Sequence, residues 1–229
     1  MRLNKRISGS GFCSRRKAEA YIFTGKVTVN GFVVSSPAID VNAQDVITIE
    51  GKELAWLPKP RLWIYYKPAG LITTHVDPYD RETVFNHLPP NMPSVISVGR
   101  LDLNSEGLLL LTNNGALARF LELPQNKFKR IYNVRAFGKV EMNKLTELGI
   151  GVVIEGVKYG KVIVRVLRGE GMNSWFEVVL YEGKNREIRK LFEYCDLKVN
   201  RLIRIAFGPY ELDDLKASET REAVINLRF

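Results

Sequence analysis

The residues with the clearest chemical potential lie in one polar loop between two apolar segments. Residues 99–113 read Gly-Arg-Leu-Asp-Leu-Asn-Ser-Glu-Gly-Leu-Leu-Leu-Leu-Thr-Asn, which brings Arg100, Asp102 and Glu106 close together in sequence. A loop held between buried strands keeps its side chains rigid, so a carboxylate here could act as a nucleophile or a general base. A single Asp in a loop more often forms a turn or a cap. The loop alone therefore does not identify an enzyme.

The charge of the chain indicates the class of its partner. The 229 residues include 34 Lys and Arg against 25 Asp and Glu, a formal net charge of +9. This balance favours an anionic partner such as nucleic acid. The excess is concentrated in residues 1–26, 126–135 and 184–204, where aromatic side chains are interleaved. Most charge runs are solvated faces, but three such clusters favour a nucleic-acid surface.

Composition argues against several other classes of protein. The longest strongly apolar run, residues 107–111, is far shorter than the roughly 20 residues that span a bilayer. The N-terminus has no apolar secretory segment, so we expect a cytoplasmic protein with no membrane partner. Two Cys residues cannot supply a disulfide framework, and with only two His residues the composition argues against a zinc cluster. With no P-loop or Rossmann fingerprint, we expect neither metal nor cofactor.

Residues 1–58 have the pattern of a small domain, and a proline-containing linker follows to about residue 61. Ser14 is expected to cap a helix over residues 15–24, after a shorter helix around residues 3–7. Prolines in the linker disfavour helix and central strand. The expected strands lie at residues 27–29, 32–34 and 46–49, the first two joined by an Asn-Gly turn.

The beginning of the second helix in this domain is unusual. Its first turn is Arg15-Arg16-Lys17, although cations there oppose the helix dipole by roughly 0.3–1 kcal/mol each. A helix N-terminus surrounded by cations is a suitable phosphate site, while tolerance of surface charge is the simpler alternative. We therefore predict RNA contacts at Arg15, Arg16, Lys17 and the nearby Lys26.

Residues 62–229 are expected to form a larger domain. Strand-like runs dominate, and several connections are too short for parallel crossovers. We predict an α+β domain with a mixed, mainly antiparallel sheet and flanking helices. The expected strands are 62–66, 95–98, 108–112, 131–137, 162–166 and 176–181, and the expected helices are 116–123, 140–148 and 186–194.

Ordered motifs in both parts of the chain resemble known families. Ser14-Arg15-Arg16, Gly25-Lys26-Val27 and Val29-Asn30-Gly31 are similar to the S4-like RNA-binding module, or alpha-L motif, over residues 2–49. The segment 99–113 closely resembles the signature of the pseudouridine synthases of the RsuA/RluB class. That family's other motifs follow in order: Lys67-Pro68-Ala69-Gly70, Arg130-Ile131-Tyr132-Asn133-Val134, residues 182–190, Arg201-Leu202-Ile203-Arg204 and Phe207-Gly208-Pro209.

This resemblance implies an isomerase that converts uridine to pseudouridine in ribosomal RNA. The bond from C1′ to N1 is cut, the uracil turns, and C1′ bonds to C5. Asp102 would be the catalytic carboxylate, in its ionised form, and would either attack C1′ or remove the 2′ proton. An ion pair with Arg189 would favour that form. Tyr132 would stack on the uracil.

The resemblance also implies contacts with the RNA around the target. Arg100 would enter the gap left by a flipped nucleotide. Lys184 and Arg186 belong to the basic motif and would bind RNA. Glu187 stands in that motif where many relatives have Gln, and Arg130 replaces a usual Lys.

Several alternatives remain open at the level of sequence. The basic motif favours the large-subunit branch, whose target is 23S rRNA, over the 16S branch. A ribosome assembly intermediate is a possible form of the substrate. A non-catalytic RNA-binding assembly factor is a further alternative, as is a hydrolase that pairs Asp102 with Glu106. The absence of a heptad pattern favours a monomer.

Overall fold

The computed structural model describes residues 1–170 and 172–227, which divide into two compact units. The first unit contains Met1–Arg61, Asn91–Ile96 and Thr112–Gly115. The second contains Leu62–Pro90, Ser97–Leu111 and the described residues from Ala116 onward. Two buried apolar clusters, one confined to residues 3–54 and one to residues 62–212, share no residue.

The first unit combines two helices with a small antiparallel sheet. Helices α1 (Leu3–Gly9) and α2 (Arg15–Phe23) precede four short strands in the order β2-β1-β3-β4. The Ser14 hydroxyl accepts a hydrogen bond from the Lys17 amide at 3.3 Å, which confirms the expected cap. The strands are β1 (Val27–Val29), β2 (Phe32–Val33), β3 (Ile47–Ile49) and β4 (Lys52–Glu53).

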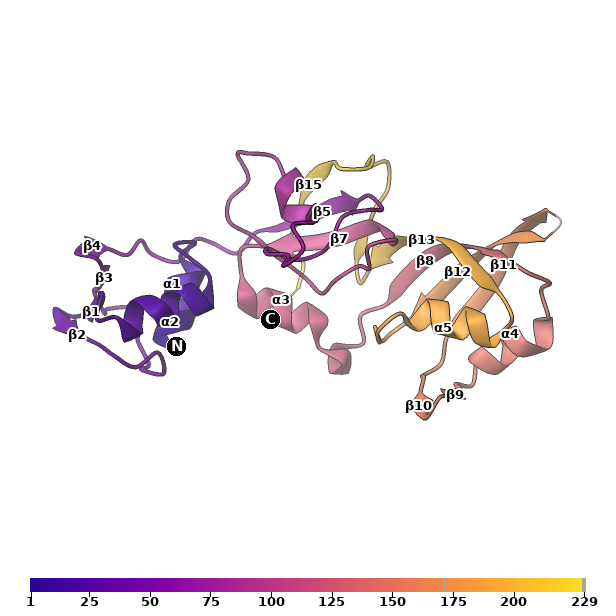
Figure 1. The fold of residues 1–229 in the computed structure, drawn as a ribbon, viewed down its shortest axis with the longest axis horizontal. Coiled ribbons are helices and arrows are strands. Elements are labelled where there is room, and N and C mark those ends of the chain that lie inside the picture. Colours follow the sequence, from indigo (N-terminus) through magenta and orange to yellow (C-terminus); the bar gives the residue numbers. More distant parts are fainter. Residues whose placement is uncertain (171, 228–229) are drawn as a thin grey trace. The chain divides into compact units, whose positions relative to one another are not determined.

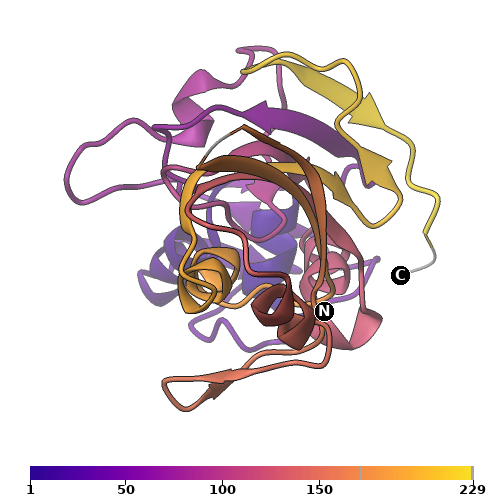
Figure 2. The ribbon, with the colours of Figure 1, turned by 90° about the vertical axis from the view of Figure 1, so that its right-hand side faces the viewer.

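The second unit is built on a nine-stranded mixed sheet, drawn in Figures 1 and 2. Seven strands follow the order β11-β12-β8-β13-β7-β5-β15, while β14 pairs with β13 and β6 with β7. The pairing of β13 with β7 is parallel, and those of β8 with β12 and β13 are antiparallel. The expected α+β class with a mainly antiparallel sheet is confirmed. The strands are β5 (Leu62–Lys67), β6 (Ile96–Ser97), β7 (Glu106–Thr112), β8 (Arg130–Phe137), β11 (Ile163–Glu170), β12 (Asn173–Leu180), β13 (Lys198–Phe207), β14 (Tyr210–Glu211) and β15 (Thr220–Ala223).

Three helices lie on one face of this sheet (Figures 1 and 2). Helix α3 (Gly115–Glu122) buries Leu117 and Leu121 against β5 and β7. Helix α5 (Glu187–Tyr194) packs on β12 through an edge-to-face pair of Phe192 and Phe176, with ring centroids 5.1 Å apart. Helix α4 (Met142–Leu148), the hairpin of β9 (Val153–Ile154) and β10 (Val157–Lys158), and the 3-10 turns η1 (Val84–His87) and η2 (Pro124–Asn126) complete the unit.

The sequence analysis did not predict β13, although it is the longest strand and lies in the middle of the sheet. Its inward positions include Arg204, which is buried beside Leu202 and Ala206. A cation at an inward position hides the alternation of apolar and polar residues by which a strand is recognised.

A close backbone contact joins β13 to the start of β7. Gly107 has φ +98°, and a Cβ there would lie 2.3 Å from the Arg204 carbonyl oxygen. Only glycine fits this parallel pairing. The register therefore fixes where the polar loop ends.

Among the residues that the structure describes, no helix is both long enough and apolar enough to cross a membrane.

Candidate active site

A cleft of about 590 Å³ in the second unit brings five of the predicted site residues together. Arg100 and Asp102 reach it from the loop before β7, and Tyr132 reaches it from β8. Lys184 and Arg186 line it from the segment before α5. Three segments that are far apart in sequence thus converge on one concavity, as a binding site requires.

The turn that carries Asp102 is held in place by a buried lysine, Lys67. The Asp102 carbonyl accepts from the Ser105 amide at 3.0 Å. The Lys67 ammonium donates to the carbonyls of Ser105 at 2.8 Å, Pro68 at 2.9 Å and Leu103 at 3.3 Å. Lys67 is fully buried, and this burial lowers its pKa to about 8 against the opposing charges of Asp102 and Glu106. Lys67 is therefore a positioning residue for the Asp102 turn.

The Arg189 side chain contacts the same turn, but it binds a backbone carbonyl of the turn and not the Asp102 carboxylate. Its guanidinium donates to the carbonyls of Asn104 and Val199, each at 3.1 Å. The expected ion pair with Asp102 is not formed among the described residues, and the Arg189 Nε is buried without a hydrogen-bond partner. Burial and the nearby Arg186 lower the pKa of Arg189, and Asp102 opposes this. The two predicted partners are thus electrostatic neighbours without direct contact.

Tyr132 lies in the wall of the cleft beside two buried cations that the sequence analysis did not propose as site residues. It is opposite Arg204 in the pairing of β8 with β13. Arg204 donates to the Leu108 carbonyl at 2.7 Å, and Arg130 donates to the Tyr181 carbonyl at 3.1 Å. Both guanidinium groups lie over the Phe207 ring, 5.2 and 4.7 Å from its centroid.

The rim of the cleft carries exposed positive charge. Within residues 1–170 and 172–227, the side chains of Arg100 and Arg186 make no hydrogen bond or ion pair, so both are available to a ligand. Lys184 differs, since it forms an ion pair with Glu182. Burial, with Glu182 beside it, raises the pKa of Glu187 to about 7.

Glu106 does not join Asp102. Its carboxylate forms two hydrogen bonds of 2.9 Å with Arg201, a bidentate ion pair, and it is not among the residues that line the cleft. A hydrolase using Asp102 and Glu106 together is therefore unsupported by the geometry.

The predicted RNA contacts of the first unit have different environments. Arg15, Arg16 and Lys17 are exposed on the first turn of α2. Lys26 forms an ion pair with Glu50 at 2.6 Å. Arg6, counted in the same basic stretch, is buried and donates to the Ala55 carbonyl at 3.0 Å. Only part of the basic stretch is thus free to meet an anion.

No group of three or more His, Cys, Asp and Glu side chains able to hold a metal ion occurs in the described part of the chain.

Comparison with known proteins identifies the family. The model for RNA pseudouridylate synthases matches residues 61–194, and that for the S4 domain matches residues 1–47. An RNA pseudouridine synthase of Rickettsia bellii is 53% identical over 226 residues, covering 99% of this chain and 98% of its own length. The ribosomal large subunit pseudouridine synthase B of Buchnera aphidicola is 39% identical over 214 residues, covering 90% of this chain and 83% of its own.

A solved structure shares the fold. A crystal structure of a pseudouridylate synthase superposes with a TM-score of 0.70 at 24% identity, covering 98% of this chain and 96% of that chain. Because the family model matches more than half of the chain and the relatives match nearly all of it, this chain belongs to the RNA pseudouridylate synthase family and carries an S4 domain at its N-terminus.

Proposed function

We propose that this protein isomerises uridine to pseudouridine at one site, or a few clustered sites, of 23S ribosomal RNA. The observation that carries the proposal is the convergence of Asp102, Tyr132 and Arg100 on one cleft. The choice of large-subunit RNA rests on the similarity to the Buchnera aphidicola enzyme, whose name states that target.

Asp102 is the catalytic carboxylate in this proposal. The bond from C1′ to N1 breaks, C1′ bonds to C5, the proton on C5 leaves and N1 gains one, so the product is an isomer of the substrate. Asp102 acts at the sugar, either as nucleophile at C1′ or as the base that takes the 2′ proton. Lys67 and Arg189 supply positive charge around its turn.

Tyr132 and Arg100 handle the flipped nucleotide. The base must leave the stack before C1′ can be reached, at a cost of a few kcal/mol. Tyr132 offers its ring to the uracil inside the cleft, where an aromatic face stabilises an extracted base. Arg100, exposed at the rim, takes the vacated space in the RNA.

The rest of the chain supplies affinity. We assign residues 1–58 to the S4-like RNA-binding domain, with a linker to about residue 61, and residues 62–229 to the catalytic domain. Arg15, Arg16 and Lys17 contact phosphates from the first domain, and Arg186 does so beside the cleft. The protein works as a monomer on ribosomal RNA, free or in an assembly intermediate, in the cytoplasm and without a cofactor.

The test compares cells with and without this gene. Pseudouridines are mapped across both ribosomal RNAs by carbodiimide modification and primer extension. The expected result is the loss of one site, or a few clustered sites, in 23S rRNA, restored by the wild-type gene. Loss of a 16S site instead would move the target to the small subunit. No lost site in either RNA would contradict the proposal and favour a non-catalytic assembly factor.

A further inference from the structure

Residues 73–82 form a closed loop beside the cleft. At its base, the Ile72 amide donates to the Glu82 carbonyl at 3.0 Å, and the Val84 amide donates to the Ile72 carbonyl at 2.9 Å. Compact surface loops whose ends are tied together in this way are often functional. The loop is thus a fixed projection of the second unit.

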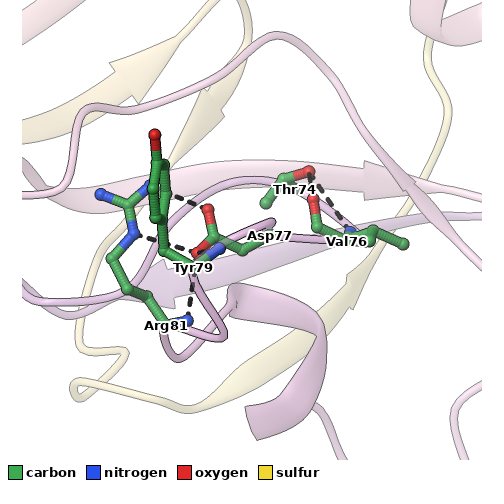
Figure 3. Close-up of polar contacts among 5 residues, drawn as sticks. All are labelled: Thr74, Val76, Asp77, Tyr79 and Arg81. Atoms are coloured by element: carbon green, nitrogen blue, oxygen red, sulfur yellow. Dashed lines mark hydrogen bonds and ion pairs between the residues drawn. The ribbon is translucent and has the colours of Figure 1, made fainter.

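The interior of the loop is held by one carboxylate, shown in Figure 3. Asp77 accepts two side-chain hydrogen bonds from Arg81, at 2.8 and 3.0 Å, and one from each backbone amide of Tyr79 and Arg81, both at 3.1 Å. The Arg81 hydrogen bonds lower the pKa of Asp77 to about 2, so this clasp stays charged at physiological pH. Thr74 adds contacts to both the carbonyl and the amide of Val76.

The hydrogen bonds of Asp77 and Thr74 hold the loop in a conformation that exposes two large side chains to solvent. Tyr79 is 77% exposed and Val76 is 80% exposed. The Arg81 guanidinium lies over the Tyr79 ring, 5.0 Å from its centroid (Figure 3), and the high exposure of Tyr79 leaves ring surface accessible to a ligand. Neither side chain stabilises the fold by burial, yet the loop that presents them is held by six hydrogen bonds, four of which involve its backbone. Such a preorganised aromatic surface suits a ligand that stacks.

The loop begins at the residue that supports the catalytic turn. Thr73 is buried, and its hydroxyl donates to the Leu101 carbonyl at 3.0 Å and accepts from the Leu101 amide at 3.4 Å. Leu101 lines the cleft and precedes Asp102. The exposed ring is therefore anchored, through one short segment, to the place where the target nucleotide would bind.

We propose that Tyr79 stacks on an unpaired RNA base near the target uridine, and that residues 73–82 thereby form a second RNA contact of the catalytic domain. The inference rests on the proposed function, which brings an RNA strand to the adjacent cleft. The Arg81 charge is already paired with Asp77, so the contact is made by the ring face and not by a phosphate. A base fits this surface because every base has a planar face, whatever its sequence.

The test measures RNA binding without turnover. Full-length Asp102→Asn protein, with and without Tyr79→Ala, is titrated against a fluorescein-labelled 12-residue oligouridylate at several salt concentrations. Loss of one stacking contact should raise the Kd by about 5- to 150-fold at each salt concentration. The slope of log K against log salt should stay the same, because no phosphate contact is lost. Tyr79→Phe, which keeps the ring, should restore binding.

A matched control separates this loop from exposed aromatics in general. Phe137, at the far end of β8 from the cleft, is also exposed, and Phe137→Ala should bind the oligouridylate like the parent protein. An unchanged Kd in Tyr79→Ala would overturn the inference, and a flatter salt slope would overturn stacking as its basis. Unchanged affinity for naked RNA, with activity lost only on ribosomal particles, would point instead to a protein partner.

The same variant also distinguishes this inference from the proposed function. Tritium release from 23S transcript labelled at C5 of uridine reports isomerisation, because C5 loses its hydrogen. Should the wild-type enzyme release no tritium from ribosomal RNA, the proposed function fails, while the oligouridylate titration still decides the role of Tyr79. Should the wild type be active and Tyr79→Ala equal it in both assays, only the inference about Tyr79 fails.

Discussion

Asp102 and Glu106 are four positions apart, yet the structure gives them different tasks. Asp102 lines the cleft, on a turn held by Lys67 and Arg189. Glu106 lies at the start of β7 and is committed to Arg201 by two hydrogen bonds. A carboxylate already neutralised by a bidentate partner is a poor base or nucleophile. Of these two carboxylates, only Asp102 should therefore be needed for the chemistry.

Asp102→Asn should fold and bind RNA but form no pseudouridine. The amide keeps the shape of the side chain and removes the anion, so the rate should fall at least about 100-fold, the smallest usual contribution of a general base. Glu106→Gln is the matched control and should retain activity. Tritium release from labelled ribosomal RNA measures both variants, and thermal unfolding confirms that they fold. Turnover by Asp102→Asn near the wild-type rate would contradict the assignment.

Residue type, spacing and the family resemblance predicted several residues that the structure brings together in this cleft, but they did not predict its buried cations. Asp102, Arg100 and the basic motif stand in polar segments next to apolar runs, where a functional side chain is visible in sequence. Lys67 and Arg204 stand inside or at the end of strands. A charged residue there resembles a surface position until the sheet register shows that it points inward. The carbonyls that Lys67 binds are likewise visible only in three dimensions.

At the scale of elements, the sequence predicted those helices and strands that depend on nearby residues, and it missed a strand that depends on distant partners. The hairpin of β1 and β2 depends on Asn30-Gly31, which adopt φ values of +53° and +84° as a type I′ turn requires. Strand β13 depends on partners about 70 and 95 residues earlier in the chain, β8 and β7. Its own sequence carries no equivalent signal, so only the assembled sheet defines it.

Gly107→Ala should disrupt the junction of β7 and β13. A Cβ at Gly107 would lie 2.3 Å from one backbone atom of Arg204 and 2.8 Å from another, so the strands must separate. The loss of stability should exceed the about 1–2 kcal/mol that a left-handed alanine costs by itself. The Asp102 loop should shift as well, lowering activity. Urea unfolding and tritium release measure the two effects.

Gly156→Ala provides the matched control for that substitution. Gly156 also has a positive φ, +76°, but nothing lies within 4 Å of its expected Cβ. This variant should lose only the stability that a left-handed alanine costs, and it should keep full activity. Equal destabilisation by the two substitutions would show that the contact with Arg204 does not constrain the sheet.

Helix α5 begins with a buried carboxyl group whose ionisation costs stability. Glu187 has a pKa near 7, above the roughly 4.3 of an unfolded chain, so the folded protein holds more protons between these values. This group's contribution to stability is therefore present at low pH and is lost as the pH rises through about 7. Its carboxylate also accepts from the Lys184 amide at 2.8 Å, a bond that a glutamine carbonyl can replace.

Glu187→Gln should raise the melting temperature at pH 8.5 more than at pH 5. A gain of about 1 kcal/mol would correspond to a rise of about 2–4 °C in a protein of this size. Thermal unfolding at the two pH values measures the difference. Glu193→Gln, at an exposed position of the same helix, is the control and should show no such dependence. An equal change for Glu187→Gln at both pH values would contradict burial as the cause.

At the scale of the whole molecule, the net charge overstates the number of cations that are available to contact RNA. Residues 1–26 hold seven basic side chains, but Arg6 is buried and Lys26 is paired with Glu50. Counterion release depends on cations that actually replace salt ions at phosphates. The structure thus reduces the number of basic side chains in residues 1–26 that can contact phosphates. Among those that remain, Arg15, Arg16 and Lys17 share one helix turn.

Replacing Arg15, Arg16 and Lys17 together by alanine should weaken RNA binding mainly at low salt. Each lost phosphate contact should flatten the slope of log K against log salt by about 0.7–0.9, so three contacts should flatten it by about 2–3. Lys26→Ala is the matched control, and its slope should change by less than one contact because Glu50 already neutralises the ammonium. Filter binding of ribosomal RNA across salt concentrations, using the Asp102→Asn protein, measures these slopes. A triple variant with the parent slope would show that the S4 domain binds RNA without this helix turn, whereas an equally large effect of Lys26→Ala would show that the ion pair opens on binding.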